Sequence, residues 1–445
     1  METTGLIASF ASSGLTVLSF VVALSIIVFV HEFGHYIVGR WSGIKAEVFS
    51  IGFGPALWSR MDRHGTRWQV AAIPLGGYVK FLGDANAASA GADEETLAHL
   101  SEDERRHTMH GAPLWARAAT VFAGPAFNFV LSIVVFAAMT FVSGVATDGP
   151  EIASIRPLPQ VNELRPGDRI LAVAGIETPD YAALAEAVEK LPPSATVEYR
   201  VLRDGKEITV TGPTLMPPIV MSVQPRSAAQ DAGLMPGDVI VAANGQPVAR
   251  LTDLQTIIRS GEGAPITLDV WRDGQVFQTT LTPRPRPVPT EDGGLETAWL
   301  IGITSSFFFE PATRHPGPVE ALGIGVSQTW GIIEGTITGI ASIISGAISS
   351  CNINGPIAIA QATGTAASAG LDSFVWMIAA LSTAIGLVNL FPIPVLDGGH
   401  LVFHAYEWAT GRPPSERFMN AAMALGLAIV LTLMLFGLTN DLFCT

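Results

Sequence analysis

The amino-acid sequence predicts a polytopic α-helical membrane protein with four transmembrane helices, a membrane-associated β-region and two repeated α+β domains. Of the 445 residues, 49% are hydrophobic and only 14% are charged, which is too apolar for an ordinary soluble protein. Four apolar stretches are each long enough to cross a bilayer as a helix. A segment of ordinary polarity between the second and the third contains the same pattern twice. The formal net charge of −14 argues against nucleic acid as a partner.

The first apolar stretch contains a His-Glu-x-x-His motif, formed by His31, Glu32 and His35. On a helix the two histidines lie one turn apart on one face, so both imidazoles can bind one metal ion. Glu32 then stands where it can take a proton from a water molecule at that ion. A charge at membrane depth costs about 2.5–3.5 kcal/mol, which marks Glu32 as a functional residue. We interpret residues 1–40 as a retained span, because no basic region precedes it as in a signal peptide.

A loop that contains several Lys and Arg residues, 41–117, follows the first span. Six Lys and Arg residues occur from position 40 to position 80 and none occurs before. The positive-inside rule therefore places this loop in the cytoplasm and the N-terminus outside. Its sequences IGFGP and QVAAIPLGGYVK predict short strands and tight turns.

These strands have two interpretations. One is a small cytoplasmic sheet, and the other is a hairpin that approaches the active site. In the second, an open strand edge binds an unwound substrate by strand addition. We then expect substrate contacts at Ile73, Gly76 and Gly77.

The second span, residues 118–143, contains Gly124, Pro125 and Asn128, which indicate close helix packing or a local break near the site. It returns the chain to the outside.

Residues 149–216 and 217–285 form two copies of one pattern, here called the first and second copy. LRPGDRIL in the first copy matches LMPGDVIV in the second at an offset of 70 residues, and Arg-Asp-Gly recurs at an offset of 69. The Pro-Gly-Asp turn, the alternating strand after it and the later helix resemble PDZ domains. PDZ grooves bind peptides by β-augmentation, and the better-matching second copy is expected to have a peptide ligand. The alternative is that both copies only act as a steric shield.

Residues 286–372 are predicted to be a linker followed by an amphipathic, membrane-leaning helical region. The linker is the proline-rich stretch 282–290, and residues 351–364 are predicted to form a turn-rich loop. Hydropathy alone would allow a fifth span at 317–346. A fifth span would reverse the orientation of the two spans that follow, and the Arg-containing loop between them would then lie outside. Because this breaks the positive-inside rule, we predict an interfacial helix instead.

The third span is predicted at residues 373–404 and the fourth at 418–440. Arg412 and Arg417 lie between them, which places this connection in the cytoplasm and the C-terminus outside. The two cysteines, Cys351 and Cys444, provide neither a disulfide framework nor a Cys-type zinc site, and whether they pair stays open.

A catalytic zinc ion usually takes a third ligand from the protein, and Asp397 is the best candidate. It lies at the cytoplasmic end of the third span, on the same membrane side as the histidine pair. Membrane topology alone therefore brings the two motifs to a common depth. His400 and His404 are the alternatives. We favour Asp397 because the adjacent Gly398 and Gly399 allow close backbone approach.

Three features together resemble the site-2 protease family of intramembrane zinc metalloproteases. They are HEFGH in the first span, the tandem PDZ-like insert, and NxxPxPxLDGG in the third span. The resemblance covers nearly the whole chain. It implies Zn²⁺ as the cofactor and Glu32 as the catalytic acid/base. The zinc ligands it implies are His31, His35 and Asp397, and the substrate-site residues are Asn389, Pro392 and Pro394.

The resemblance also implies hydrolysis of peptide bonds in or near the transmembrane segment of single-span substrates. Anti-sigma factor-like proteins after a first cut, and remnant signal peptides, are the implied substrates, within an envelope stress response. The expected location is the bacterial inner membrane, with the PDZ-like domains outside and the active site toward the cytoplasm. Two other classes are a non-enzymatic PDZ membrane scaffold and a metal transporter. A scaffold needs no intramembrane metal motif, and a transporter needs no Glu between the histidines.

Overall fold

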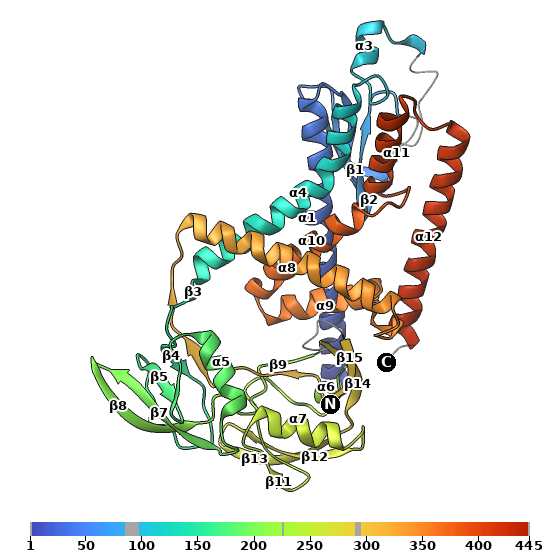
Figure 1. Ribbon diagram of the computed structural model, residues 1–445. Helices are drawn as coiled ribbons and strands as arrows, with labels where there is room; N and C mark the ends of the chain where they lie inside the picture. Colours follow the sequence, from blue (N-terminus) through green and yellow to red (C-terminus); the bar gives the residue numbers. More distant parts are fainter. Residues whose placement is uncertain (1, 85–97, 225–226, 290–294, 444–445) are drawn as a thin grey trace. The chain divides into compact units, whose positions relative to one another are not determined.

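The computed structural model describes residues 2–84, 98–224, 227–289 and 295–443 (Figure 1). The chain divides into two compact units. The first consists of Met1–Met139, Pro318–Ile340 and Cys351–Thr445, and the second of Thr140–Gly317 and Ala341–Ser350. The His-Glu-x-x-His motif lies in the first unit and the repeated pattern lies in the second.

Four helices of the first unit are long and apolar enough to cross a membrane, in agreement with the four predicted spans. The helix α8, Pro318–Ile344, is not among the four candidates found in the described residues, as predicted. The four helices are α1 (Glu2–Trp41), α4 (Leu114–Ser143), α10 (Leu371–Asn389) and α12 (Glu416–Phe443).

The predicted third span differs from the structure at its C-terminal end. The helix α10 ends at Asn389, and a separate helix, α11 (Asp397–Thr410), begins at Asp397. Pro392 and Pro394 lie in the connection, where they remove backbone donors that a continuous helix would need. A Cβ atom added at Gly398 or Gly399 would collide with the backbone of this connection. The two glycines therefore allow α11 to fold back tightly.

The predicted β-region is a long antiparallel hairpin of β1 (Ala46–Met61) and β2 (Arg67–Phe81), which packs against α1 (Figure 1). At the turn of the hairpin, the Asp62 carboxylate accepts hydrogen bonds from the Tyr36 hydroxyl at 3.1 Å and from Trp68 Nε1 at 3.0 Å. Because Tyr36 belongs to α1, these bonds fix the hairpin on the helix that contains the His-Glu-x-x-His motif.

The predicted loop 351–364 is wrong from Pro356 onward, because Pro356–Ala369 forms the helix α9 after a short 3₁₀ turn at Ser350–Asn352. The helix packs closely on α1: a Cβ atom at Gly364 would lie 2.5 Å from Thr16 Oγ1. Small residues that indicate turns in a sequence here permit close helix packing. The question of a Cys351–Cys444 pair lies outside the described residues, because Cys444 is not among them.

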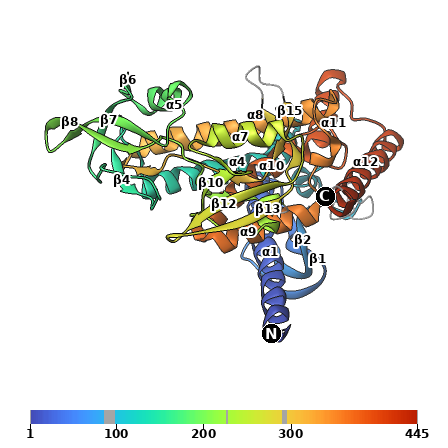
Figure 2. The same cartoon turned by 90° about the horizontal axis from the view of Figure 1, so that it is seen from below.

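The second unit contains two four-stranded sheets with the same strand arrangement, which matches the sequence repeat. Figure 2 shows the long β7–β8 and β12–β13 hairpins of the two sheets. The first copy has the order β6-β5-β7-β8 with α5, and the second has β11-β10-β12-β13 with α7. The first set is β5 (Arg169–Val173), β6 (Ile176–Glu177), α5 (Tyr181–Lys190), β7 (Thr196–Arg203) and β8 (Lys206–Pro213). The second set is α6 (Ala228–Asp231), β10 (Val239–Ala243), β11 (Gln246–Pro247), α7 (Leu251–Ser260), β12 (Ile266–Arg272) and β13 (Gln275–Leu281).

One buried ion pair connects the two repeated signatures in each copy. Asp168 of the first Pro-Gly-Asp turn is paired with Arg203 of the first Arg-Asp-Gly turn, with both contacts at 2.7 Å. Asp238 and Arg272 make the same two contacts in the second copy, at 2.6 and 2.7 Å. Each aspartate is only 1% exposed, so the bidentate geometry and additional hydrogen bonds compensate for its burial.

The predicted linker 282–290 is wrong at its centre, because β14 (Arg284–Pro289) pairs with β15 (Leu295–Leu300). Residues 295–314, here called the return segment, then supply one strand to each copy. The strand β16 (Ile303–Thr304) pairs with β9 (Ser222–Val223) of the second copy, and β17 (Phe309–Pro311) pairs with β4 (Ile152–Ile155) of the first. Finally, β18 (Thr313–Arg314) pairs with β3 (Val145–Ala146). The predicted ends of the copies, residue 216 for the first and residue 285 for the second, are thus too early.

Candidate metal centre

His31 and His35 on α1 meet Asp397 at the start of α11. His31 Nε2 lies 3.2 Å from His35 Nε2 and 3.2 Å from Asp397 Oδ2, and His35 Nε2 lies 3.5 Å from Asp397 Oδ1. Tetrahedral zinc with bonds of about 2.0–2.2 Å holds its ligand atoms roughly 3.3–3.5 Å apart. The donor types and their spacing therefore fit one zinc ion. In the described part of the chain, no other group of three His, Cys, Asp or Glu residues converges in this way.

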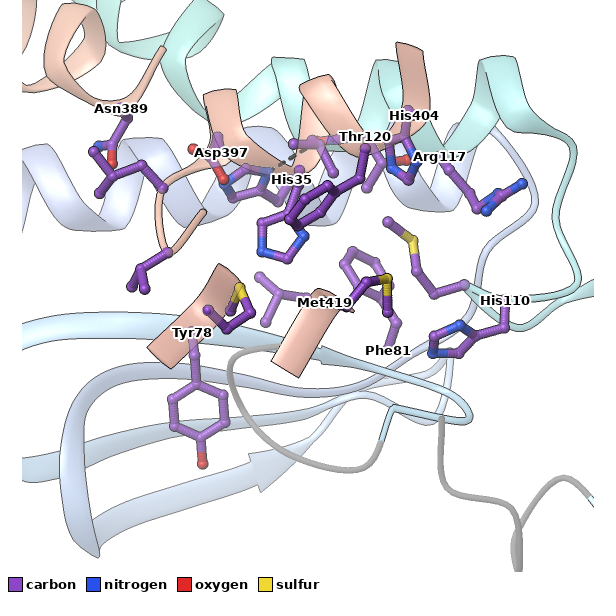
Figure 3. A pocket seen from close by; sticks show the side chains of 18 of the residues that line it. His35, Tyr78, Phe81, His110, Arg117, Thr120, Asn389, Asp397, His404 and Met419 are labelled. Atoms are coloured by element: carbon purple, nitrogen blue, oxygen red, sulfur yellow. Dashed lines mark hydrogen bonds and ion pairs between the residues drawn. The ribbon is translucent and has the colours of Figure 1, made fainter. Parts of the chain in front are cut away.

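A cavity of about 370 Å³ lies beside these three residues. Figure 3 shows His35, Asp397 and Asn389 at its wall, with Tyr78 and Phe81 of the hairpin on another side. Glu32 also lines the cavity. The hairpin covers Glu32 closely, since a Cβ atom at Gly77 would lie 3.0 Å from Glu32 Cγ. Glu32 of the motif and the hairpin thus line the same cavity as the metal-binding side chains.

The other predicted substrate-site residues are divided between this cavity and its surroundings. Asn389 and Gly77 line the cavity, whereas Ile73, Gly76, Pro392 and Pro394 are not among its lining residues. Gly76 lies against the Phe53 ring within the hairpin, and Ile73 is half exposed. These four positions are therefore not brought to the metal-binding cluster.

The alternative ligands His400 and His404 line the same cavity but do not join the cluster. Burial and the nearby Arg117 guanidinium lower the pKa of His404 to about 4, so its imidazole is neutral at pH 7. Arg117 itself makes a bidentate ion pair with Glu407, at 2.6 and 3.0 Å. This pair connects α4 to α11, and both of its residues line the cavity.

The helix α4 supports both histidine rings, a role that the sequence did not reveal. The Thr120 backbone carbonyl accepts a hydrogen bond from His35 Nδ1 at 2.8 Å, which leaves Nε2 free to face the cluster. At Gly124, an added Cβ atom would overlap the His35 ring and lie 2.9 Å from His31 Cε1. Thr120, Gly124 and Asn128 are spaced four residues apart, and this one-face spacing is the signal that could have identified them.

Two histidines and a carboxylate from distant segments of a membrane protein, with a glutamate beside them, define a metallopeptidase site. The chain belongs to peptidase family M50, the site-2 protease family, whose family model matches residues 19–433. This confirms the resemblance that the motifs indicated, and the protein is a zinc metalloprotease.

Similar proteins match this chain over nearly its whole length. The regulator of sigma-E protease RseP of Salmonella typhimurium is 34% identical over 454 residues, covering 95% of this chain and 97% of its own. RseP of Escherichia coli is 33% identical with the same coverage. A protein of Agrobacterium fabrum that is named as a zinc metalloprotease is 36% identical over 432 residues, covering 96% of this chain and 95% of its own.

Substitution of Gly77 by Ala is expected to lower proteolytic activity at least tenfold while zinc remains bound. The added Cβ atom would lie 2.8 Å from the Ser50 carbonyl oxygen and 3.0 Å from Glu32 Cγ, so the hairpin must move away from Glu32. Cleavage of a single-span reporter and zinc content of the purified protein measure the two effects. Gly65→Asn is the matched control, because Gly65 has open space around it and Asn tolerates its positive φ. Wild-type cleavage by Gly77→Ala would contradict the close contact.

Proposed function

We propose that this protein is an intramembrane protease whose zinc ion is held by His31, His35 and Asp397, with Glu32 as the catalytic acid/base. The observation that carries the proposal is the mutual spacing of the three ligand groups, at 3.2, 3.2 and 3.5 Å. The location of both histidines in a helix able to span a membrane supports cleavage at membrane depth.

The residues around the cavity have separate roles in peptide hydrolysis. Zinc, when bound, polarises the scissile carbonyl and lowers the pKa of water to about 7. The Glu32 carboxylate takes the proton of the attacking water and transfers it to the leaving amine. The Asn389 side chain lines the same cavity and either holds the substrate backbone or donates to the developing oxyanion.

The substrate must be unwound before it can be cut, because a helix hides its backbone carbonyls. We assign this role to the β1–β2 hairpin, which lies against α1 and reaches Glu32 at Gly77. A substrate strand paired to the hairpin satisfies backbone groups that would otherwise be exposed in an apolar region. Pro392 and Pro394 contribute by keeping α10 and α11 apart, which shapes the wall next to Asn389.

Metal analysis tests the proposed ligand set. Wild-type protein is expected to hold about one zinc ion per chain, and Asp397→Ala to lose it during purification, because two histidines alone bind zinc weakly. Asp372→Ala is the matched control, since Asp372 is an exposed aspartate of α10. Zinc retained in full by Asp397→Ala would contradict the ligand assignment.

We further propose that the substrates are single-span membrane proteins in the bacterial inner membrane. The proposed substrates are anti-sigma factor-like proteins that have already been cut once, and remnant signal peptides. Their cleavage would belong to an envelope stress response. The names of the RseP relatives, which refer to sigma-E regulation, support this class. The distribution of Lys and Arg supports an active site toward the cytoplasm and PDZ-like copies outside.

Both copies are proposed to be PDZ-like domains that act as a size filter. Their common strand order and their equivalent buried Arg–Asp pairs support a shared fold. The second copy has the additional possibility of a peptide ligand, bound by strand addition. Bulky ectodomains would be excluded, and only substrates already shortened on the outer side would reach the site.

Removal of both copies is expected to permit cleavage of untrimmed substrate. Since β17 completes the first copy, the deletion should run from residue 149 to 311 and be joined by a short Gly-Ser linker. This keeps β3 and β18, which already pair with each other. Reporter cleavage is measured with untrimmed and with trimmed substrate, the latter controlling for intact catalysis. A deleted protein that cuts only trimmed substrate would contradict the filter.

A further inference from the structure

Asn128 places a fully buried amide in the middle of the membrane-spanning helix α4. Such a group is costly in an apolar environment unless its hydrogen bonds are made. One amide atom, Nδ2, lies 3.3 Å from Nδ1 of His31. The other, Oδ1, has no hydrogen-bond partner among the described residues. The amide therefore has one neighbour of functional interest, the candidate ligand His31.

The position of this amide is determined by contacts with α10. The hydroxyl of Ser382 donates to the Asn128 backbone carbonyl at 3.0 Å. The hydroxyl of Ser132, one turn further along α4, lies 2.8 Å from the Ala379 carbonyl of α10. A Cβ atom at Gly386 would lie 3.1 Å from Asn128 Cβ, so the two helices are in close contact here. All these groups are buried, and they hold the amide against the His31 ring.

The chemistry of His31 determines which amide atom it needs. Its Nε2 atom faces His35 and Asp397, so a neutral ring that binds metal through Nε2 carries its proton on Nδ1. That N–H requires an acceptor, whereas an amide nitrogen is a donor. An asparagine side chain rotated by half a turn occupies the same volume with its oxygen and nitrogen exchanged. The rotated amide presents Oδ1 to His31 and removes the contact between two donors.

The arrangement is the same as that of the second histidine. The Nδ1 atom of His35 donates to the Thr120 carbonyl of α4 at 2.8 Å. Thr120 and Asn128 are two helical turns apart, and Gly124 lies between them against both rings. One face of α4 therefore places a polar group beside Nδ1 of each histidine.

We propose that Asn128 is a positioning residue whose Oδ1 accepts the Nδ1–H of His31 and thereby holds Nε2 toward the metal. This rests on the proposed metal centre. Partners of this kind fix the tautomer and orientation of a ligating histidine, and losing one typically costs about 10–100-fold in metal affinity.

Three variants distinguish this role from packing. Asn128→Leu keeps the approximate volume without hydrogen-bonding groups, Asn128→Asp keeps an oxygen acceptor, and Asn440→Leu removes another buried asparagine, on α12. Zinc affinity of the purified full-length chain is measured by competition with a chelator. We expect Asn128→Leu to bind zinc about 10–100-fold more weakly than wild type. Asn128→Asp and the control are expected to stay within about threefold of wild type.

The visible spectrum of the Co²⁺-substituted protein supplies a second readout of ligand geometry. It is expected to change in Asn128→Leu and to be restored in Asn128→Asp. Wild-type zinc affinity in Asn128→Leu would overturn the inference, as would an Asn128→Asp protein that binds as weakly as Asn128→Leu. A wild-type chain that binds no zinc would overturn the metal centre itself, which separates the two failures.

Discussion

Glu32→Gln is expected to lower cleavage of a single-span reporter by at least about a thousandfold while leaving bound zinc unchanged. A glutamine amide cannot take a proton from water, and general acid–base catalysis typically contributes roughly 10²–10⁴-fold. The substitution is nearly isosteric, so the contact between Glu32 and Gly77 is retained. Reporter cleavage in membranes and zinc content of the purified protein are measured together.

Glu47→Gln is the matched control for this experiment. Glu47 makes an ion pair with Lys80 at 3.0 Å and does not line the cavity. The pair is partly exposed and such pairs contribute little, so cleavage should stay near wild type. Near-normal cleavage by Glu32→Gln would exclude the assigned role. A wild-type chain that moves metal across a membrane but cuts no reporter would instead support a transporter.

Gly124→Ala is expected to abolish zinc binding and cleavage together. The added Cβ atom would overlap the His35 ring and lie 2.5 Å from its Cε1 atom, and α1 cannot retreat without also moving His31. The loss should be at least as large as the roughly 10–100-fold that follows removal of an outer hydrogen-bond partner. Zinc affinity, measured by chelator competition, is the direct test.

The helical preference of alanine makes this substitution informative. Alanine is favoured over glycine by about 0.8–1.0 kcal/mol in a helix interior, so weakened zinc binding would not come from a weakened helix. Gly335→Ala is the control, because nothing lies within 4 Å of the Cβ atom added at that position of α8. A Gly124→Ala protein with wild-type zinc affinity would show that α4 does not press on the histidine rings.

Side-chain spacing and the predicted membrane topology were sufficient to expect His31, His35 and Asp397 near one another, and the structure brings the three side chains together. One helical turn fixes the distance between the histidines, and the length of a span fixes the depth of the aspartate. The support from Thr120 was not predicted, because a backbone carbonyl has no signature of its own in a sequence, and only the four-residue spacing of Thr120, Gly124 and Asn128 marks this face of α4. The separate helix α11 was not predicted. Pro392 and Pro394 indicate that a helix ends near them, but nothing in the local sequence shows that a new helix begins at Asp397.

The strands of the return segment could not be predicted from the sequence for a different reason. Its strands β16, β17 and β18 are two or three residues long, too short for an alternating pattern, and their partners lie far away in the chain. The paired turns of the two copies were visible because the same residue types recur at nearly the same offset. The boundaries of the copies were not visible in the sequence, because strand pairing between distant segments determines them.

The return segment also determines when the second unit can form during synthesis. Phe308 and Phe309 belong to the core of the first copy, and Ile301 belongs to the core of the second. A nascent chain that has reached residue 285 therefore has neither core complete, although all residues of both sheets have been made. The usual order, in which an N-terminal domain folds before its successor is translated, does not apply here. Both cores become complete over the same few residues, so the core of the first copy still lacks Phe308 and Phe309 while the second copy is being translated.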